Sequence, residues 1–83
     1  MLTIEQLRAA RGLLGWSQST LAARAGLSLP TVKRVEVDLG PRVSNESRNK
    51  LRRTLELAGV EFIDENGGGP GVRLRKRQQK KKT

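Results

Sequence analysis

Cysteine and histidine are both absent from the 83-residue chain, and Trp16 and Phe62 are its only aromatic residues. Without cysteine there is neither a disulfide framework nor a zinc-finger ligand set, so a reducing cytoplasm is the expected setting. Without histidine as well, the commonest general base and the usual metal ligands are missing, which argues against an enzyme and against a cofactor. No apolar run approaches the roughly 18 residues of a membrane span, so no membrane association is expected.

Acidic residues are few: 17 lysines and arginines stand against 8 aspartates and glutamates, which gives a net charge of +9. Seven of the basic residues fall within residues 73–83, so residues 1–72 hold ten basic and eight acidic groups. Residues 76–83 have no apolar periodicity, and we expect them to form a disordered basic tail. Net charge alone would therefore attribute nucleic-acid binding mainly to this tail, and the function of the rest must be argued from its motifs.

Four helices are predicted from capping residues and hydrophobic spacing. Thr3 and Gln6 have the spacing of a capping box, and Pro30 suits the first turn of the third helix. The fourth helix is expected to run to about Ala58. The N-cap candidates are Thr3, Ser17, Ser28 and Ser44, and the glycines expected to end helices are Gly15, Gly26 and Gly59.

A period of two replaces the helical spacing after residue 59 and predicts two strands around a glycine-rich turn. Their apolar residues are Val60, Phe62, Val72 and Leu74, and Glu61 on the other face is expected to lie near an arginine. We expect residues 60–75 to be a dimerisation extension that buries these apolar residues across a two-fold axis. In the alternative, the hairpin folds back on the fourth helix, and dimers form through helix surfaces.

Residues 18–35 carry the most informative pattern. A helix-turn-helix needs a small residue where its two helices touch and a glycine in its turn, and Ala22 and Gly26 meet these needs. The motif also requires apolar residues around the small residue and the turn glycine. The chain supplies Leu21, Ala25, Leu27, Val32 and Val35 at these positions. The alternative is a generic helical hairpin within a small bundle, which does not require this combination of positions.

Together with Arg11 and the segments 15–18 and 31–36, this pattern resembles the lambda-repressor-like, Cro/repressor-type DNA-binding domain of the XRE family, over about residues 3–58. Residues 58–75 are similar to the extension of very short bacterial or mobile-element members. The resemblance implies a mainly α fold with four to five helices in residues 1–59, followed by a short β-hairpin in residues 60–75 and the basic tail. It also implies a transcriptional regulator associated with the nucleoid, expected to be a repressor that binds a pseudo-palindromic operator in double-stranded DNA as a homodimer.

Position by position, the resemblance assigns Gln18 to the DNA backbone and to bracing the second motif helix. The positions that it turns toward the major groove are Ser28, Leu29, Pro30, Thr31, Lys33 and Arg34. Arg34 is suited to a bidentate contact with guanine, whereas Leu29 and Pro30 can only contact thymine methyl groups or define shape.

Two further groups of residues have expected roles. Arg11 and Glu36 match a family ion pair that joins the first helix to the end of the recognition helix. Arg42 and the helix start at Ser44 and Asn45 are the candidates for binding phosphate.

Two other functions remain open at this point. An antitoxin or antiactivator would use the same fold to mask a partner protein. The apolar Leu29 and Pro30 are consistent with this alternative, because apolar residues on the groove-facing surface favour a protein partner. Thr31, Lys33 and Arg34 favour DNA instead. Nonspecific RNA binding through the tail has little support, because both aromatic residues are better used in the core than for stacking on bases.

Overall fold

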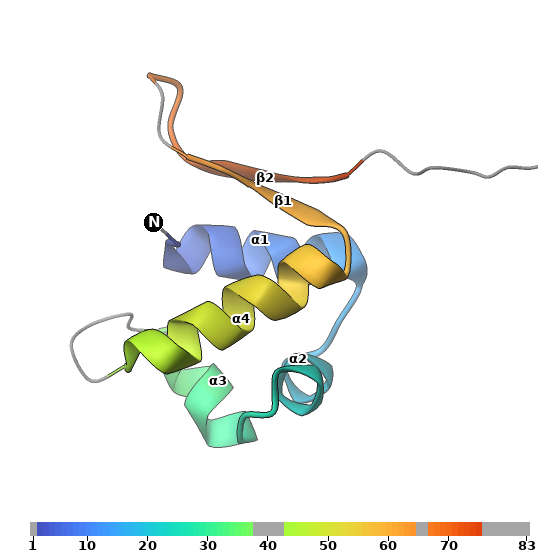
Figure 1. The fold of residues 1–83 in the computed structure, drawn as a ribbon, viewed down its shortest axis with the longest axis vertical. Helices are drawn as coiled ribbons and strands as arrows, with labels where there is room; N and C mark the ends of the chain where they lie inside the picture. Colours follow the sequence, from blue (N-terminus) through green and yellow to red (C-terminus); the bar gives the residue numbers. More distant parts are fainter. Residues whose placement is uncertain (1, 38–42, 65–66, 76–83) are drawn as a thin grey trace, which may run out of the picture.

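The computed structural model describes residues 2–37, 43–64 and 67–75 (Figure 1). Within this part the elements are α1 (Ile4–Leu14), α2 (Gln18–Ala25), α3 (Leu29–Val35), α4 (Asn45–Leu57), β1 (Val60–Ile63) and β2 (Gly71–Leu74). The predicted fold, mainly helical with a C-terminal hairpin, is confirmed, with four helices in the described residues. None of those helices combines the length and the apolar character needed to cross a bilayer.

The helices begin at the residues that the sequence predicts. The side-chain oxygens that accept a backbone N–H three residues later belong to Thr3, Ser17, Ser28 and Ser44. Gly15 and Gly26 follow α1 and α2 in the left-handed region, with φ of 68° and 70°. A side chain with a β-carbon would be strained there, so these two glycines fix where the chain turns between the first three helices.

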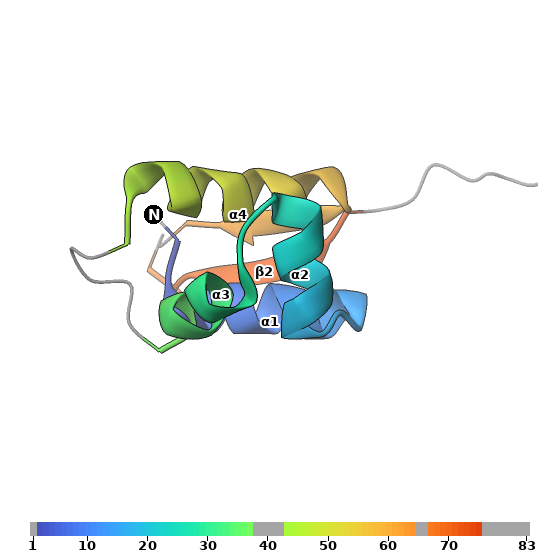
Figure 2. The same ribbon diagram turned by 90° about the horizontal axis from the view of Figure 1, so that it is seen from below.

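The core lies between α4 on one side and α1, α2 and α3 on the other (Figures 1 and 2). Both valines of α3, Val32 and Val35, are fully buried in it. Because a short helix gains most of its stability from packing, these two contacts fix which side of α3 faces solvent. The other fully buried apolar side chains are Leu7, Ala10, Leu21, Leu51 and Leu55, and Val60 is almost fully buried.

The hairpin is antiparallel, with Phe62 opposite Val72 and Glu61 opposite Arg73. Arg73 Nε lies 2.5 Å from Glu61 Oε1 on the outer face, which confirms the predicted cross-strand pair. The inner face packs against α1 and α4, and Val60 is only 1% exposed. The burial of Val60 across a two-fold axis is therefore a wrong prediction, because Val60 lies in the core of its own chain.

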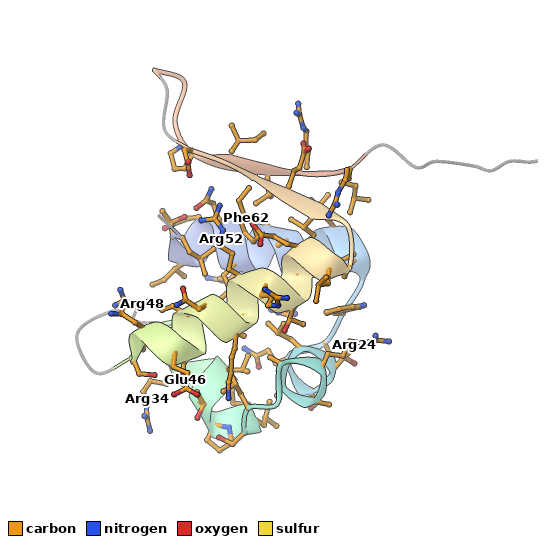
Figure 3. All side chains as sticks on the ribbon, viewed as in Figure 1. Arg24, Arg34, Glu46, Arg48, Arg52 and Phe62 are labelled. Carbon is orange, nitrogen blue, oxygen red and sulfur yellow. The ribbon has the colours of Figure 1, made fainter. Side chains whose placement is uncertain are left out.

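The rest of the inner face follows the alternative in which the hairpin folds back on α4. Phe62 and Val72 pack against the same core, and the guanidinium carbon of Arg52 on α4 lies 5.1 Å from the centroid of the Phe62 ring (Figure 3). A dimerisation role for residues 60–75 stays a prediction. It now depends on the strand residues that this packing leaves exposed, of which Leu74 is the largest apolar one.

Gln6 joins the start of α1 to the hairpin. Its Oε1 accepts the Thr3 N–H at 3.0 Å, as the capping box predicts. Its Nε2 donates to the carbonyls of Ile63 at 3.1 Å and Gly71 at 2.9 Å, which face each other across the two strands. The side chain is buried, and every hydrogen-bonding group of its amide is used. Gln6 therefore holds the end of the hairpin next to its loop against α1.

We expect Gln6→Glu to lower the free energy of unfolding by about 1–3 kcal/mol at neutral pH. The carboxylate can still accept the Thr3 N–H, but it cannot donate to the two strand carbonyls. Denaturation followed by circular dichroism measures the change, and the exposed neighbour substitution Glu5→Gln is the control. The deficit should shrink in acid, where the protonated carboxyl regains one donor. Equal stability of Gln6→Glu and the parent chain would contradict this role.

Candidate nucleic-acid interface

The second helix of the motif, α3, presents a polar side to solvent. Lys33 and Arg34 are exposed, while Val32 and Val35 on either side of them are fully buried. Arg34 lies on the outer side of α3 (Figure 3). The structure thus brings together two of the predicted groove-facing residues on the side of α3 that its buried valines turn toward solvent.

The first turn of α3 contains the other four predicted groove-facing residues. Ser28 Oγ accepts the Thr31 N–H at 3.2 Å and lies 2.8 Å from Thr31 Oγ1, so both hydroxyls take part in the cap. Pro30 is exposed, and Leu29 is half-buried. The tip of the helix is therefore a small surface of two hydroxyls and two apolar side chains, and Ser28 contributes to it while it also starts the helix.

The end of α3 is bound to α1 by a bidentate ion pair. Arg11 Nε lies 2.7 Å from Glu36 Oε2, and Arg11 Nη2 lies 2.9 Å from Oε1, which confirms the expected pairing. The remaining nitrogen, Arg11 Nη1, donates to the Trp16 carbonyl at 3.0 Å, between α1 and α2. One guanidinium group therefore fixes the connection into α2 and the last turn of α3 at once.

Gln18 belongs to the same network. Its Nε2 donates to Glu36 Oε1 at 3.1 Å, so the first residue of α2 braces the end of α3. Burial by itself would raise the pKa of Glu36, but the hydrogen bonds from Arg11 and Gln18 and the charges of Arg11 and Arg8 lower it overall. The pKa of Arg11 is raised, chiefly by its hydrogen bonds to Glu36.

A hollow opens beside this network, between α1, the start of α2 and the end of α3. It is lined by Arg8, Arg11, Ser17, Gln18, Lys33, Glu36 and Val37. The hollow places Gln18 and Lys33 together, as a contact with one DNA strand would require. It also adds Arg8, an exposed residue of α1 that the sequence analysis missed, because the helical period marks Arg8 only as a solvent-facing position.

The phosphate candidates at the start of α4 lie apart from this hollow. Ser44 accepts the Ser47 N–H at 3.1 Å, and both Ser44 and Asn45 are exposed. The start of α4 lies on the same lower side of the molecule as α3 (Figure 1), and Figure 2 looks onto that side. Arg42, the third candidate, is outside the described residues.

Comparison with known protein families gives one finding. The model of the helix-turn-helix family HTH_3 matches residues 7–45, which run from α1 to the first residue of α4 and contain all of α2 and α3. No curated protein matches the chain. The family match coincides with the segment that contains the Arg11–Glu36 network and the hollow.

We expect Glu36→Gln to destabilise the fold by roughly 1.5–3 kcal/mol, the usual contribution of hydrogen bonds to a charged group. The lowered pKa of Glu36 means that its ionised form stabilises the fold above the ordinary glutamate value of about 4.3. This contribution disappears as the pH falls through the lower, folded-state pKa. The variant should therefore lose less stability than the parent chain between neutral pH and acid.

Denaturant titrations over a pH series measure this difference. The matched control is Glu46→Gln, because the Glu46 side chain is 78% exposed and its ion pair with Lys50, at 3.5 Å, lies in solvent. Such a pair contributes little, so the control should keep the pH profile of the parent chain. Parallel profiles for Glu36→Gln and the parent would refute the electrostatic role of Glu36.

Proposed function

We propose that this chain is a sequence-specific repressor that binds a pseudo-palindromic operator as a homodimer. The premise is that residues 7–45 match the helix-turn-helix family HTH_3, whose domains bind DNA in transcriptional regulation. The observation that carries the proposal is the solvent side of α3, where Lys33 and Arg34 are exposed between buried valines. A cationic, hydrogen-bonding helix surface held rigidly by the core is what the major groove accommodates.

In this proposal the residues of α3 read the base edges. Arg34 makes the bidentate contact with O6 and N7 of a guanine, and Thr31 adds a hydroxyl at the tip of the helix. Leu29 and Pro30 have no hydrogen-bonding group in their side chains. They contact thymine methyl groups, which makes thymine the expected base opposite the first turn of α3.

The hollow beside the Arg11–Glu36 pair holds the DNA backbone. Gln18, Arg8 and Lys33 surround it from three helices, and a phosphate placed there receives hydrogen bonds from all three and positive charge from Arg8 and Lys33. Ser44 and Asn45 at the start of α4 hold a second phosphate on the same side of the molecule. Contacts of this kind fix the register of α3 in the groove but carry no sequence information.

A second candidate function is that of an antitoxin or antiactivator. The observation that favours it is the apolar pair Leu29 and Pro30 at the tip of α3, where a protein partner would find a surface free of charge. Selection of binding sites from random duplex DNA separates the two functions. Enrichment of a defined inverted repeat supports the repressor, and the absence of any enriched sequence favours the protein partner.

We expect Arg34→Ala to weaken binding to the selected site by about 1–3 kcal/mol and to relax the preference for one base pair in each half-site. Fluorescence anisotropy on the selected duplex and on duplexes changed at single base pairs measures both effects. Arg53→Ala is the control, because Arg53 is an exposed arginine of α4 and has the same charge. Equal losses of affinity on selected and random duplexes would identify Arg34 as a phosphate contact instead.

Arg8→Ala should weaken binding to all duplexes alike and leave the preferred sequence unchanged. If Arg8 neutralises one phosphate, the slope of log K against log salt becomes shallower by about 0.9 for each bound subunit. Salt titrations measure the slope, again with Arg53→Ala as the control of equal charge. An unchanged slope would mean that the hollow does not contact DNA, and an altered base preference would mean that Arg8 reaches into a groove.

A further inference from the structure

Three leucines are exposed at one end of the molecule. The C-terminal ends of α1, α4 and β2 meet there, on the right-hand side of Figures 1 and 2. Leu57, the last residue of α4, is 77% exposed, Leu74 of β2 is 49% exposed, and Leu13 of α1 is 43% exposed. Three large apolar side chains at the ends of three elements form a cluster of the kind that marks interaction surfaces.

Two hollows lie side by side on this surface and share Ala58. One is lined by Trp16, Arg24, Thr54, Leu57 and Ala58. The other is lined by Leu13, Leu14, Ala58, Gly59, Leu74 and Arg75. We call the residues of these two hollows the leucine end. Because Leu57 projects beside a hollow with an aromatic wall, the leucine end presents both a protruding side chain and a recess.

The charged groups of the leucine end are held by residues of the same chain. The guanidinium carbon of Arg24 lies 4.8 Å from the centroid of the Trp16 ring, and Arg75 Nη2 donates to the Glu56 carbonyl. Apolar residues and the backbone of Ala58 and Gly59 lie between these two arginines. A surface of this kind matches neither the phosphates of DNA nor a charged peptide.

We propose that the leucine end is the docking surface for a second copy of this chain. A two-fold axis brings the same patch of both copies together, so the surface must be complementary to itself. Leu57 of each copy then fills the hollow beside Trp16 of the other, and Leu13 and Leu74 close the contact around it. This proposal rests on the proposed function, since a pseudo-palindromic operator needs two recognition helices in one assembly.

The position of α3 agrees with this contact. In both views α3 lies away from the leucine end, so a second copy docked there covers neither Lys33 nor Arg34. The two-fold axis then places one α3 on each side of the contact, as two half-sites about 34–36 Å apart require. Leu74 also gives the hairpin a part in the dimer that does not disturb the packing of Val60.

The test uses the full chain and its single tryptophan. Sedimentation equilibrium from micromolar to millimolar concentration should show a dimer, and on dilution the emission of Trp16 should shift to the red as its hollow opens. In Leu57→Glu the dissociation constant of the dimer should rise roughly 100-fold, because two leucines leave the contact. Trp16 emission in the variant should then be independent of concentration over the range in which the parent chain is dimeric.

Val37→Glu is the matched control, because Val37 is 79% exposed but lies beside the DNA-facing hollow at the end of α3. It should keep the dimer and bind DNA more weakly. Leu57→Glu should lose the dimer, keep its helical circular dichroism and still bind a duplex that holds one half-site. This separates the proposal from the proposed function, because single-half-site binding tests DNA recognition without the dimer.

Several outcomes would overturn the proposal. A parent chain that is monomeric throughout the concentration range has no such contact. A Leu57→Glu protein that remains a dimer, or a dimer whose formation leaves Trp16 emission unchanged, has its interface elsewhere, with the free edge of the hairpin as the next surface to test. A folded Leu57→Glu protein that loses single-half-site binding would place Leu57 on the DNA instead.

Discussion

The orientation of α3 depends on one guanidinium group. Arg11 binds both oxygens of Glu36 and the Trp16 carbonyl, so α1, the entry into α2 and the end of α3 meet at a single side chain. α3 has just seven residues and two fully buried side chains, too few to fix both its tilt and its rotation by packing alone. The ion pair supplies the missing constraint, and Gln18 adds a second one from α2. The proposed reading of bases by Arg34 depends on this positioning.

The pattern of N-caps made the helices predictable, because a cap involves residues only three apart. Thr3, Ser17, Ser28 and Ser44 could be identified from neighbouring residues, and so could the glycines that follow helices with positive φ, namely Gly15, Gly26 and Gly59. The Glu61–Arg73 pair followed from the period-two pattern of the strands. The Arg11–Glu36 pair joins residues 25 positions apart, and a resemblance to a known family indicated it, where local pattern could not.

Contacts that depend on how the elements pack could not be predicted in this way. Gln6 was recognised as a member of a capping box, but its donors bind carbonyls 57 and 65 residues along the chain. The wrong prediction for Val60 has the same cause, because its burial also depends on how the elements pack. Its alternation with Glu61 correctly indicates an apolar face, yet alternation cannot say whether that face packs on the same chain or on a second copy. The roles proposed for Arg8 and Leu57 could not be predicted either, because periodicity marks both residues only as exposed.

Because residues 1–72 carry little net charge, the proposed DNA binding by this part of the chain depends on the groove-facing surface. Residues 1–72 carry a net charge of only +2, so general attraction to DNA from this part of the chain is weak. In the proposed function, recognition by residues 1–72 therefore comes from a few well-placed groups, namely Arg34 at the base edges and Arg8, Gln18 and Lys33 around a phosphate. One such set spans only a few base pairs, so specificity requires a second set at a fixed distance. The leucine end is uncharged at its centre and lies away from α3. It can therefore join two copies without competing with DNA for the same side chains.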